Sequence, residues 1–180
     1  MKKIKIILAL SLINFGGFAQ NIYLCKAGET SFFSETPLEN ISALNKKVAA
    51  VIDIDKNEVA VKMTMVDFKF KNHLMEEHFN ENYMESDKYP IGTFKGKIQE
   101  LIDYSKNGTY LVTAKGQLVM HGVSKDRTLS GKLTVANGQI TLTSDFLIPL
   151  KDHKIDVPTL VMAKIAEEIS VKCKFVFQKK

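Results

Sequence analysis

The sequence predicts an all-β protein, an antiparallel sheet of seven or eight strands that carries two short helices. Beyond about residue 20, most segments alternate apolar and polar residues with a period of two, which is typical of strands with one dry and one wet face. Asn-Gly pairs at Asn107 and Asn137 are typical of tight hairpin turns, so neighbouring strands should run antiparallel. Only two segments show helical spacing instead.

The first 19 residues are predicted to be a secretory signal peptide. Three lysines precede an apolar run at 6–18, and the small residues Gly17 and Ala19 stand where a signal peptidase reads the chain. The run is short for a membrane span and is interrupted by polar residues, which disfavours an uncleaved anchor. We therefore expect a signal peptide at 1–19 and one domain at 20–180, in a protein that is periplasmic or secreted.

The charge of the chain gives no support for nucleic-acid binding. The sequence has 25 basic and 20 acidic residues, and three of the lysines belong to the predicted signal peptide, which leaves 22 basic against 20 acidic residues in the domain. Arg127 is the only arginine, and the lysines are interleaved with acids rather than clustered on one element. The length that remains suits a single domain with one core.

Alternating apolar rows predict the individual strands, most clearly at 110–120, 140–150 and 171–177. Gly116, inside the first of these rows, predicts a bend or bulge of the kind that closes a barrel. The apolar phase changes parity near Met65, and one extra residue there would shift the side chains to the other face. We therefore predict a bulge near Met65.

Two segments are predicted to be short helices that lie on or over the sheet. Residues 72–84 place apolar side chains at helical spacing with glutamates on the other side. The second segment begins at Pro158, a favoured first residue of a helix, and keeps helical spacing to Glu168.

A resemblance to a known family runs through the chain. Residues 68–96 read FKFKNHLMEEHFNENYMESDKYPIGTFKG, which resembles the helix and following strand of YceI-like proteins, a lipocalin-like family associated with polyisoprenoid binding. Further similar segments follow the family's order at 31–53, 116–125, 146–158 and 165–167. The resemblance implies a closed antiparallel lipocalin-like barrel of about eight strands with two short helices, whose apolar interior holds a long isoprenoid or similar amphiphile.

Two cysteines, Cys25 and Cys173, lie near the two ends of the domain. In an exported protein they can form a disulfide, which would require the first and last strands to be neighbours, as they are in a closed barrel. The alternative is two separate buried thiols, and the sequence favours neither.

No motif points to catalysis or to a bound metal. His73 and His78 are five residues apart, about 140° around a helix, so they cannot chelate a metal as an i, i+4 pair does. His121, beside Gly122 at a strand end, is predicted to hydrogen-bond across a turn at the barrel rim. Because no nucleophile elbow, phosphate loop or catalytic carboxylate pair is present, we expect no enzyme activity and no cofactor.

The apolar interior is the predicted site of function. The chain has eleven Phe and seven Met, many at inward strand positions, which suit a tunnel for the tail of an apolar or amphiphilic small molecule of the polyisoprenoid, quinone or fatty acid type. Transient contact with a membrane is a further hypothesis. The alternative is a filled barrel that docks a partner protein and holds no ligand.

The predicted ligand-binding residues lie on inward strand positions and on the first helix, with two polar side chains to meet a head group. They are Phe68, Phe70, Leu118, Met120, Phe146, Ile148, Phe175 and Phe177 on the strands, Leu74, Met75 and Phe79 on the helix, and Asn72 and Tyr83 for the head group.

Overall fold

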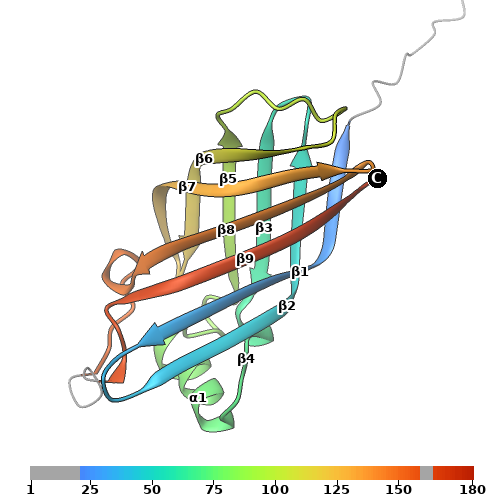
Figure 1. Ribbon diagram of the computed structural model, residues 1–180. Coiled ribbons are helices and arrows are strands. Elements are labelled where there is room, and N and C mark those ends of the chain that lie inside the picture. Colours follow the sequence, from blue (N-terminus) through green and yellow to red (C-terminus); the bar gives the residue numbers. More distant parts are fainter. Residues whose placement is uncertain (1–20, 159–163) are drawn as a thin grey trace, which may run out of the picture.

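A computed structural model describes residues 21–158 and 164–180, and the predicted signal peptide lies outside them. Within the described residues eight strands form a closed antiparallel barrel, which confirms the predicted fold (Figure 1). Each of these strands pairs with the next along the chain, and the last returns to pair with the first. The strands are β1 (Ile22–Glu35), β2 (Asn40–Asp53), β3 (Glu58–Thr64), β5 (Ile91–Ile98), β6 (Gly108–Met120), β7 (Val123–Ala136), β8 (Gln139–Pro149) and β9 (Glu168–Lys179).

The remaining elements gather at one end of the barrel. They are the 3₁₀ turns η1 (Met65–Asp67) and η3 (Leu150–His153), the short strand β4 (Lys69–Phe70), the helix α1 (His73–His78) and the π-helical turn η2 (Phe79–Tyr83).

The first predicted helix is confirmed as α1 and η2. Asn72 is its cap, because the Asn72 side-chain oxygen accepts a hydrogen bond of 3.0 Å from the backbone N–H of Leu74. The second predicted helix lies partly outside the described residues, and its predicted end is wrong, because Glu168 is the first residue of β9.

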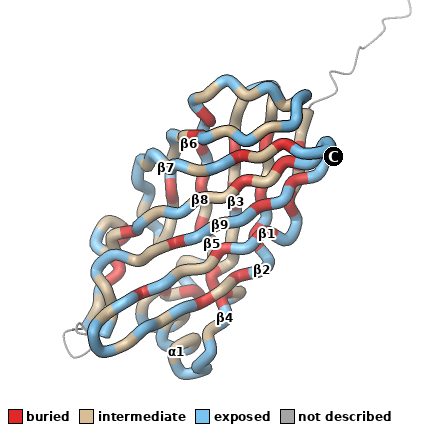
Figure 2. Tube along the Cα trace, viewed as in Figure 1, coloured by how far each residue is buried: buried red, intermediate tan, exposed pale blue. Residues whose placement is uncertain are grey.

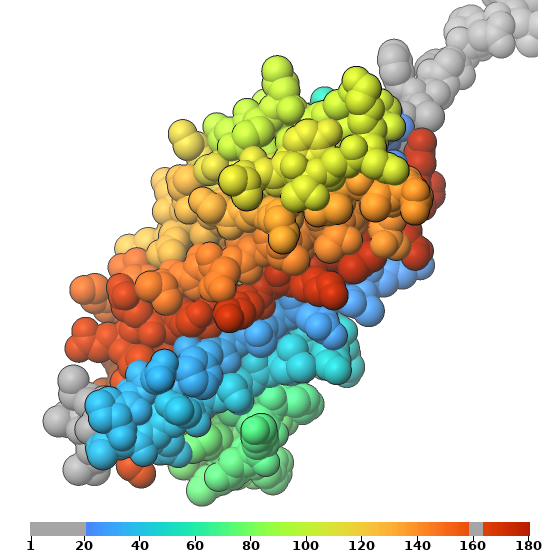
Figure 3. Space-filling model, in the orientation of Figure 1, coloured from blue at the N-terminus to red at the C-terminus, as the bar shows by residue number. Residues whose placement is uncertain are grey.

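Buried and exposed residues alternate along the strands, as the tube in Figure 2 shows. On one face of the molecule, the side chains of β8, β9, β1 and β2 form a continuous wall (Figure 3). The inward residues at the end remote from α1 meet at the barrel axis and fill it. The buried side chains there include Phe94, Ile98, Leu133, Phe175 and Phe177.

The barrel wall loosens toward the end that carries α1. β7 and β8 pair only where Gly131 to Ala136 oppose Ser144 to Gln139, and the rest of β7 toward Val123 has no pairing with β8. There the guanidinium of Arg127 donates a hydrogen bond to the carbonyl oxygen of Leu147 and joins the two strands through a side chain.

A second break in the wall lies between β2 and β3, which pair only from Ala49 to Asp53 of β2. Asn45, fully buried beside this break, donates its side-chain amide to the carbonyl oxygen of Thr64 at 3.0 Å. Its side-chain oxygen accepts the backbone N–H of Lys47 at 2.8 Å, so both ends of the amide are satisfied. β4 then pairs with β2 on the far side of the break.

The predicted bulge near Met65 is wrong. β3 ends at Thr64, and η1 makes one 3₁₀ turn before β4, so the turn rather than an inserted strand residue changes the parity. The irregularity in the wall lies instead in β1, whose register with β2 shifts between Cys25 and Gly28.

One of the two predicted tight hairpins is confirmed and the other is wrong. Asn137 and Gly138 have φ of 50° and 76° and join β7 directly to β8, as predicted. Asn107 is not in a tight turn, because the connection 99–107 separates β5 from β6. The other two-residue turn is formed by His121 and Gly122, with φ of 51° and 70°.

The disulfide is absent, although the strands that carry the cysteines are neighbours. β1 pairs with β9 so that Cys173 lies opposite Thr30, five residues along from Cys25. Five strand residues span about 16 Å, far beyond the reach of a disulfide. Both cysteines are free thiols, and burial raises the pKa of Cys173 to about 11.

Gly116 marks a close approach of two strands and not the predicted bulge. It pairs with Gly96 of β5 in a regular register, and a Cβ on Gly116 would overlap the carbonyl oxygen of Lys95. No side chain fits against that backbone.

Replacing Gly116 by Ala should therefore destabilise the barrel by about 3 kcal/mol, because β5 and β6 must move apart. The matched control is Gly138→Ala, where nothing lies within 4 Å of the added Cβ and only the positive φ is unfavourable, at about 1 kcal/mol. Urea unfolding of both variants measures the difference. Equal losses of stability would show that the strand contact at Gly116 is not tight.

Candidate functional site

The half of the barrel beside α1 is hollow and encloses a cavity of about 430 Å³. This lies within the usual range of small-molecule sites, about 300–1,000 Å³. Residues of the barrel strands form about half of its wall, and a segment at 72–90, here called the cover segment, closes one side. The wall is almost wholly apolar.

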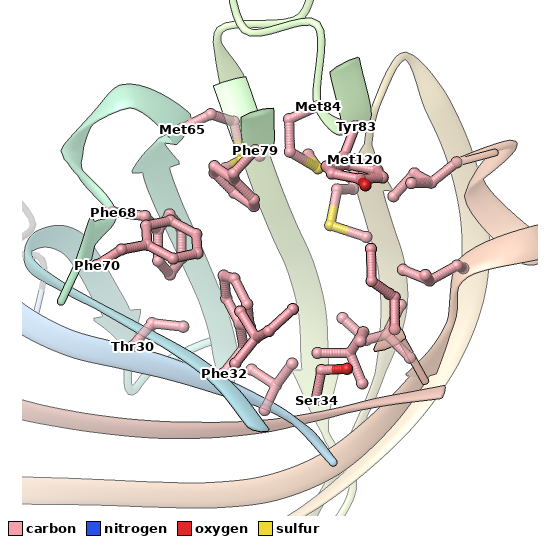
Figure 4. Close-up of a pocket in the computed structure, with 18 of the residues that line it drawn as sticks. Thr30, Phe32, Ser34, Met65, Phe68, Phe70, Phe79, Tyr83, Met84 and Met120 are labelled. Atoms are coloured by element: carbon pink, nitrogen blue, oxygen red, sulfur yellow. The ribbon is translucent and has the colours of Figure 1, made fainter. Parts of the chain in front are cut away.

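Four phenylalanine rings form one side of the cavity (Figure 4). Phe32 of β1 contacts Phe68, Phe70 and Phe79, and the ring centroids within the group lie 5.2 to 5.7 Å apart. These are the separations that aromatic pairs prefer. The contacts join β1 to β4 and to the cover segment, so the group both lines the cavity and positions its cover.

Methionines make up much of the remaining wall. All five methionines of the described residues line the cavity, and they come from β3, η1, the cover segment and β6. Thioether side chains are flexible and polarizable, so this part of the wall can adapt to the shape of a bound molecule. They are Met63, Met65, Met75, Met84 and Met120.

The few polar groups on the wall are mostly neutral. Ser34, which is buried, accepts a hydrogen bond of 2.9 Å from the backbone N–H of Ala166. Burial raises the pKa of Tyr83, so its hydroxyl stays protonated at neutral pH and can donate. At the rim, Lys164 lies 3.7 Å from a carboxylate oxygen of Glu39.

The cover segment is held to the turn between β6 and β7 by His121. One ring nitrogen of His121 lies 2.8 Å from the carboxylate of Glu85, and the other lies 3.0 Å from the carbonyl oxygen of His153. Tyr89 packs edge-on against the same ring, with the centroids 4.7 Å apart. This confirms the prediction that His121 hydrogen-bonds at the rim. The hydrogen bond from His121 lowers the pKa of Glu85.

Most of the residues predicted to bind ligand line this cavity. Eleven of the thirteen do so, and the exceptions are Phe175, which borders a smaller pocket, and Phe177, which is fully buried in the filled half. Asn72 lies at the rim, but its side-chain oxygen is used to cap α1.

Sequence reasoning missed several lining residues. Phe32 follows Ser31 and precedes Phe33, so alternation alone cannot say which of the two rings points inward. Other residues lie in or near η1, where the predicted parity is wrong, or at strand ends. The missed residues include Thr30, Phe32, Ser34, Ile41, Met63, Met65, Met84, Leu150, Ile155, Ile169 and Val171.

Within the described ranges, no group of three His, Cys, Asp or Glu residues is placed to hold a metal ion. No helix at 21–158 or 164–180 is both long enough and apolar enough to cross a membrane.

Comparison with known proteins identifies relatives of this barrel. A family model described as YceI-like domain matches residues 26–177. No curated protein sequence matches the chain.

Solved structures with the same fold include the following three. A polyisoprenoid binding domain from Saccharophagus degradans, implicated in plant cell wall breakdown, has a TM-score of 0.75 at 13% identity, over 89% of this chain and 99% of that one. BcnA from Burkholderia cenocepacia has a TM-score of 0.70 at 15% identity, over 83% and 95%. A YCEI protein from Campylobacter jejuni has a TM-score of 0.61 at 20% identity, over 76% and 84%.

A buried histidine beside the cavity should make the stability of the barrel depend on pH. His153 is fully buried, and its Nδ1–H donates to the carbonyl oxygens of Met120 and Val123 at 3.3 and 3.2 Å. Its Nε2 has no hydrogen-bond partner among the described residues. Burial lowers the pKa of His153.

An unfolded histidine takes up a proton near pH 6.5, whereas folded His153 does so only at lower pH. Acidification from about pH 8 to about pH 5.5 should therefore favour unfolding, by up to about 1.4 kcal/mol per pH unit from this group. Urea unfolding across this range measures the slope. His153→Asn keeps an N–H donor without titrating, so its slope should be smaller, and an unchanged slope would contradict the assignment.

Proposed function

The chain belongs to the YceI-like domain family, and from this membership and the hollow half of the barrel we propose that it is an exported binding protein for an isoprenoid-type or other amphiphilic lipid. The observation that carries the proposal is the cavity of about 430 Å³ whose wall is formed by phenylalanine, methionine and aliphatic side chains. A filled barrel that only docks a partner protein would have no need of such a space.

The wall favours binding through an apolar tail. Each methylene group moved from water into the cavity contributes about 0.8 kcal/mol, so a tail of a dozen or so carbons would bind tightly without any polar contact. The charged pair Glu39 and Lys164 lies at the rim, and no charged side chain among the described residues of the wall is buried. The tail therefore points inward and the head group lies at the rim.

Two exposed leucines suit exchange with a lipid surface. Leu38, at the turn between β1 and β2, is 68% exposed, and Leu74 of α1 is 55% exposed. Leu74 lines the cavity, as does Glu39 next to Leu38, so both leucines lie at its rim. We propose that transient contact of this rim with a membrane lets a lipid enter or leave, and that the protein acts by packing, without catalysis.

Extraction of the protein purified from the periplasm, followed by mass spectrometry of the extract, tests the proposal. We expect an isoprenoid or other amphiphile in an amount close to one molecule per chain. A clean extract, together with no uptake of added quinone or polyprenyl lipid, would favour the filled-barrel alternative.

Phe79→Ser should weaken the binding of such a lipid by about 10-fold to about 100-fold, because burying one phenylalanine side chain is worth about 1.5–3 kcal/mol. Phe79 belongs to the cover segment and not to a barrel strand, so the barrel should still fold. Leu111→Ser, on an outward-facing residue that is 82% exposed, is the control and should bind as the unchanged protein does. Equal affinities of the two variants in a lipid titration would contradict the proposed site.

A further inference from the structure

The interior of the barrel is divided by three side chains into a large cavity and a small deeper pocket. Met63 of β3, Leu118 of β6 and Phe146 of β8 line both spaces, so they form the partition between them. The deeper pocket, of about 70 Å³, is bordered by residues of the filled half such as Phe94 and Phe175. Beyond it the core side chains occupy the axis.

The volume of the large cavity sets how much of a ligand can be buried. An apolar cavity of about 150 Å³ holds one benzene molecule, which is about 25 Å³ per carbon. At that density about 430 Å³ holds roughly 17 carbons. The deeper pocket of about 70 Å³ adds room for about three more carbons if the side chains of the partition move aside.

A long polyprenyl chain does not fit inside this volume. About 40 carbons would need about 1,000 Å³ at the same density, more than twice the space available. The filled half cannot supply the difference, because side chains such as Leu133 and Phe177 are fully buried there.

The polar side chains Ser144 and Cys173 of the deeper pocket are poorly placed to bind the head group of a ligand. Ser144 donates its hydroxyl proton to the carbonyl oxygen of Ser130 at 2.6 Å, and the Cys173 thiol lies 3.5 Å from the hydroxyl of Thr30. Ser144 and Cys173 therefore each already have a partner within the barrel. A bound tail would therefore end at the partition with its terminal methyl group.

We propose that the cavity takes single-chain amphiphiles whose tail has at most about 17 to 20 carbons, straight or isoprenoid, and that Met63, Leu118 and Phe146 set this limit. The inference rests on the proposed function and narrows its ligand class. It restricts the carrier to fatty or short isoprenoid tails that are wholly enclosed.

A chain-length series tests the limit directly. The probe is bound N-phenyl-1-naphthylamine, displaced by n-alkanols of about 8 to about 24 carbons, a range that brackets the expected limit. Affinity should rise about fourfold per methylene group while the tail is still being buried. It should level off near 17 carbons. A rise that continues to the longest alkanol would overturn the limit and leave the proposed function intact, whereas no binding of the probe or of any alkanol would overturn both.

Variants of the partition test which residues set the limit. Leu118→Ala should join the two spaces and move the plateau by about three carbons. Phe146→Ala, on a different strand, should move it in the same direction and serves if the first variant folds poorly. Leu133→Ala is the matched control, because Leu133 is fully buried but lines neither space, so it should lower Tm and leave the plateau in place. The assignment of the partition residues would be overturned if affinity levelled off at the same chain length in a folded partition variant as in the unchanged protein. It would also be overturned if the Leu133→Ala control shifted that chain length equally.

Discussion

The width of a barrel closed by eight strands is the constraint on which the rest of the structure depends. Such a barrel is just wide enough for its inward side chains to fill it or to leave room for one small ligand. This protein does both, because inward residues such as Leu133 and Phe177 meet at the axis in one half, whereas the inward side chains of the other half surround the cavity. A single barrel is thereby divided along its axis into a core and a cavity.

The strand pairing reinforces this division. At the hollow end the pairings of β2 with β3 and of β7 with β8 stop short. Asn45 and Arg127 join the strands there through side-chain hydrogen bonds to the carbonyl oxygens of Thr64 and Leu147. A wall joined by side chains can spread more easily than one joined by a continuous ladder, because fewer backbone hydrogen bonds must break. The wall around the cavity is therefore able to deform at these two places.

The fold class, the antiparallel order and part of the cavity wall could be predicted from the sequence, because alternation reports which face of a strand a side chain occupies. Alternation does not report how far along the barrel axis a residue lies. Phe146 and Phe175 both face inward as predicted, yet only Phe146 lines the cavity, since Phe175 lies four residues from the filled end of β9. For the same reason the sequence could not decide between a disulfide and two separate thiols, because the register of β1 on β9, which separates Cys25 from Cys173 along the axis, cannot be read from alternation.

The two kinds of side chain around the cavity have different mechanical roles. The phenylalanines contact one another through rings with few rotatable bonds, and they tie β1, β4 and the cover segment together, so this side keeps its shape when the cavity is empty. The methionines lie on segments that include η1 and the cover segment, and their thioethers can change rotamer at little cost. A cavity built this way discriminates poorly between tails of different cross-section, straight or branched, because the soft side adjusts to each. It discriminates by length, because at its inner end the adaptable side chains give way to a close-packed core that does not adjust.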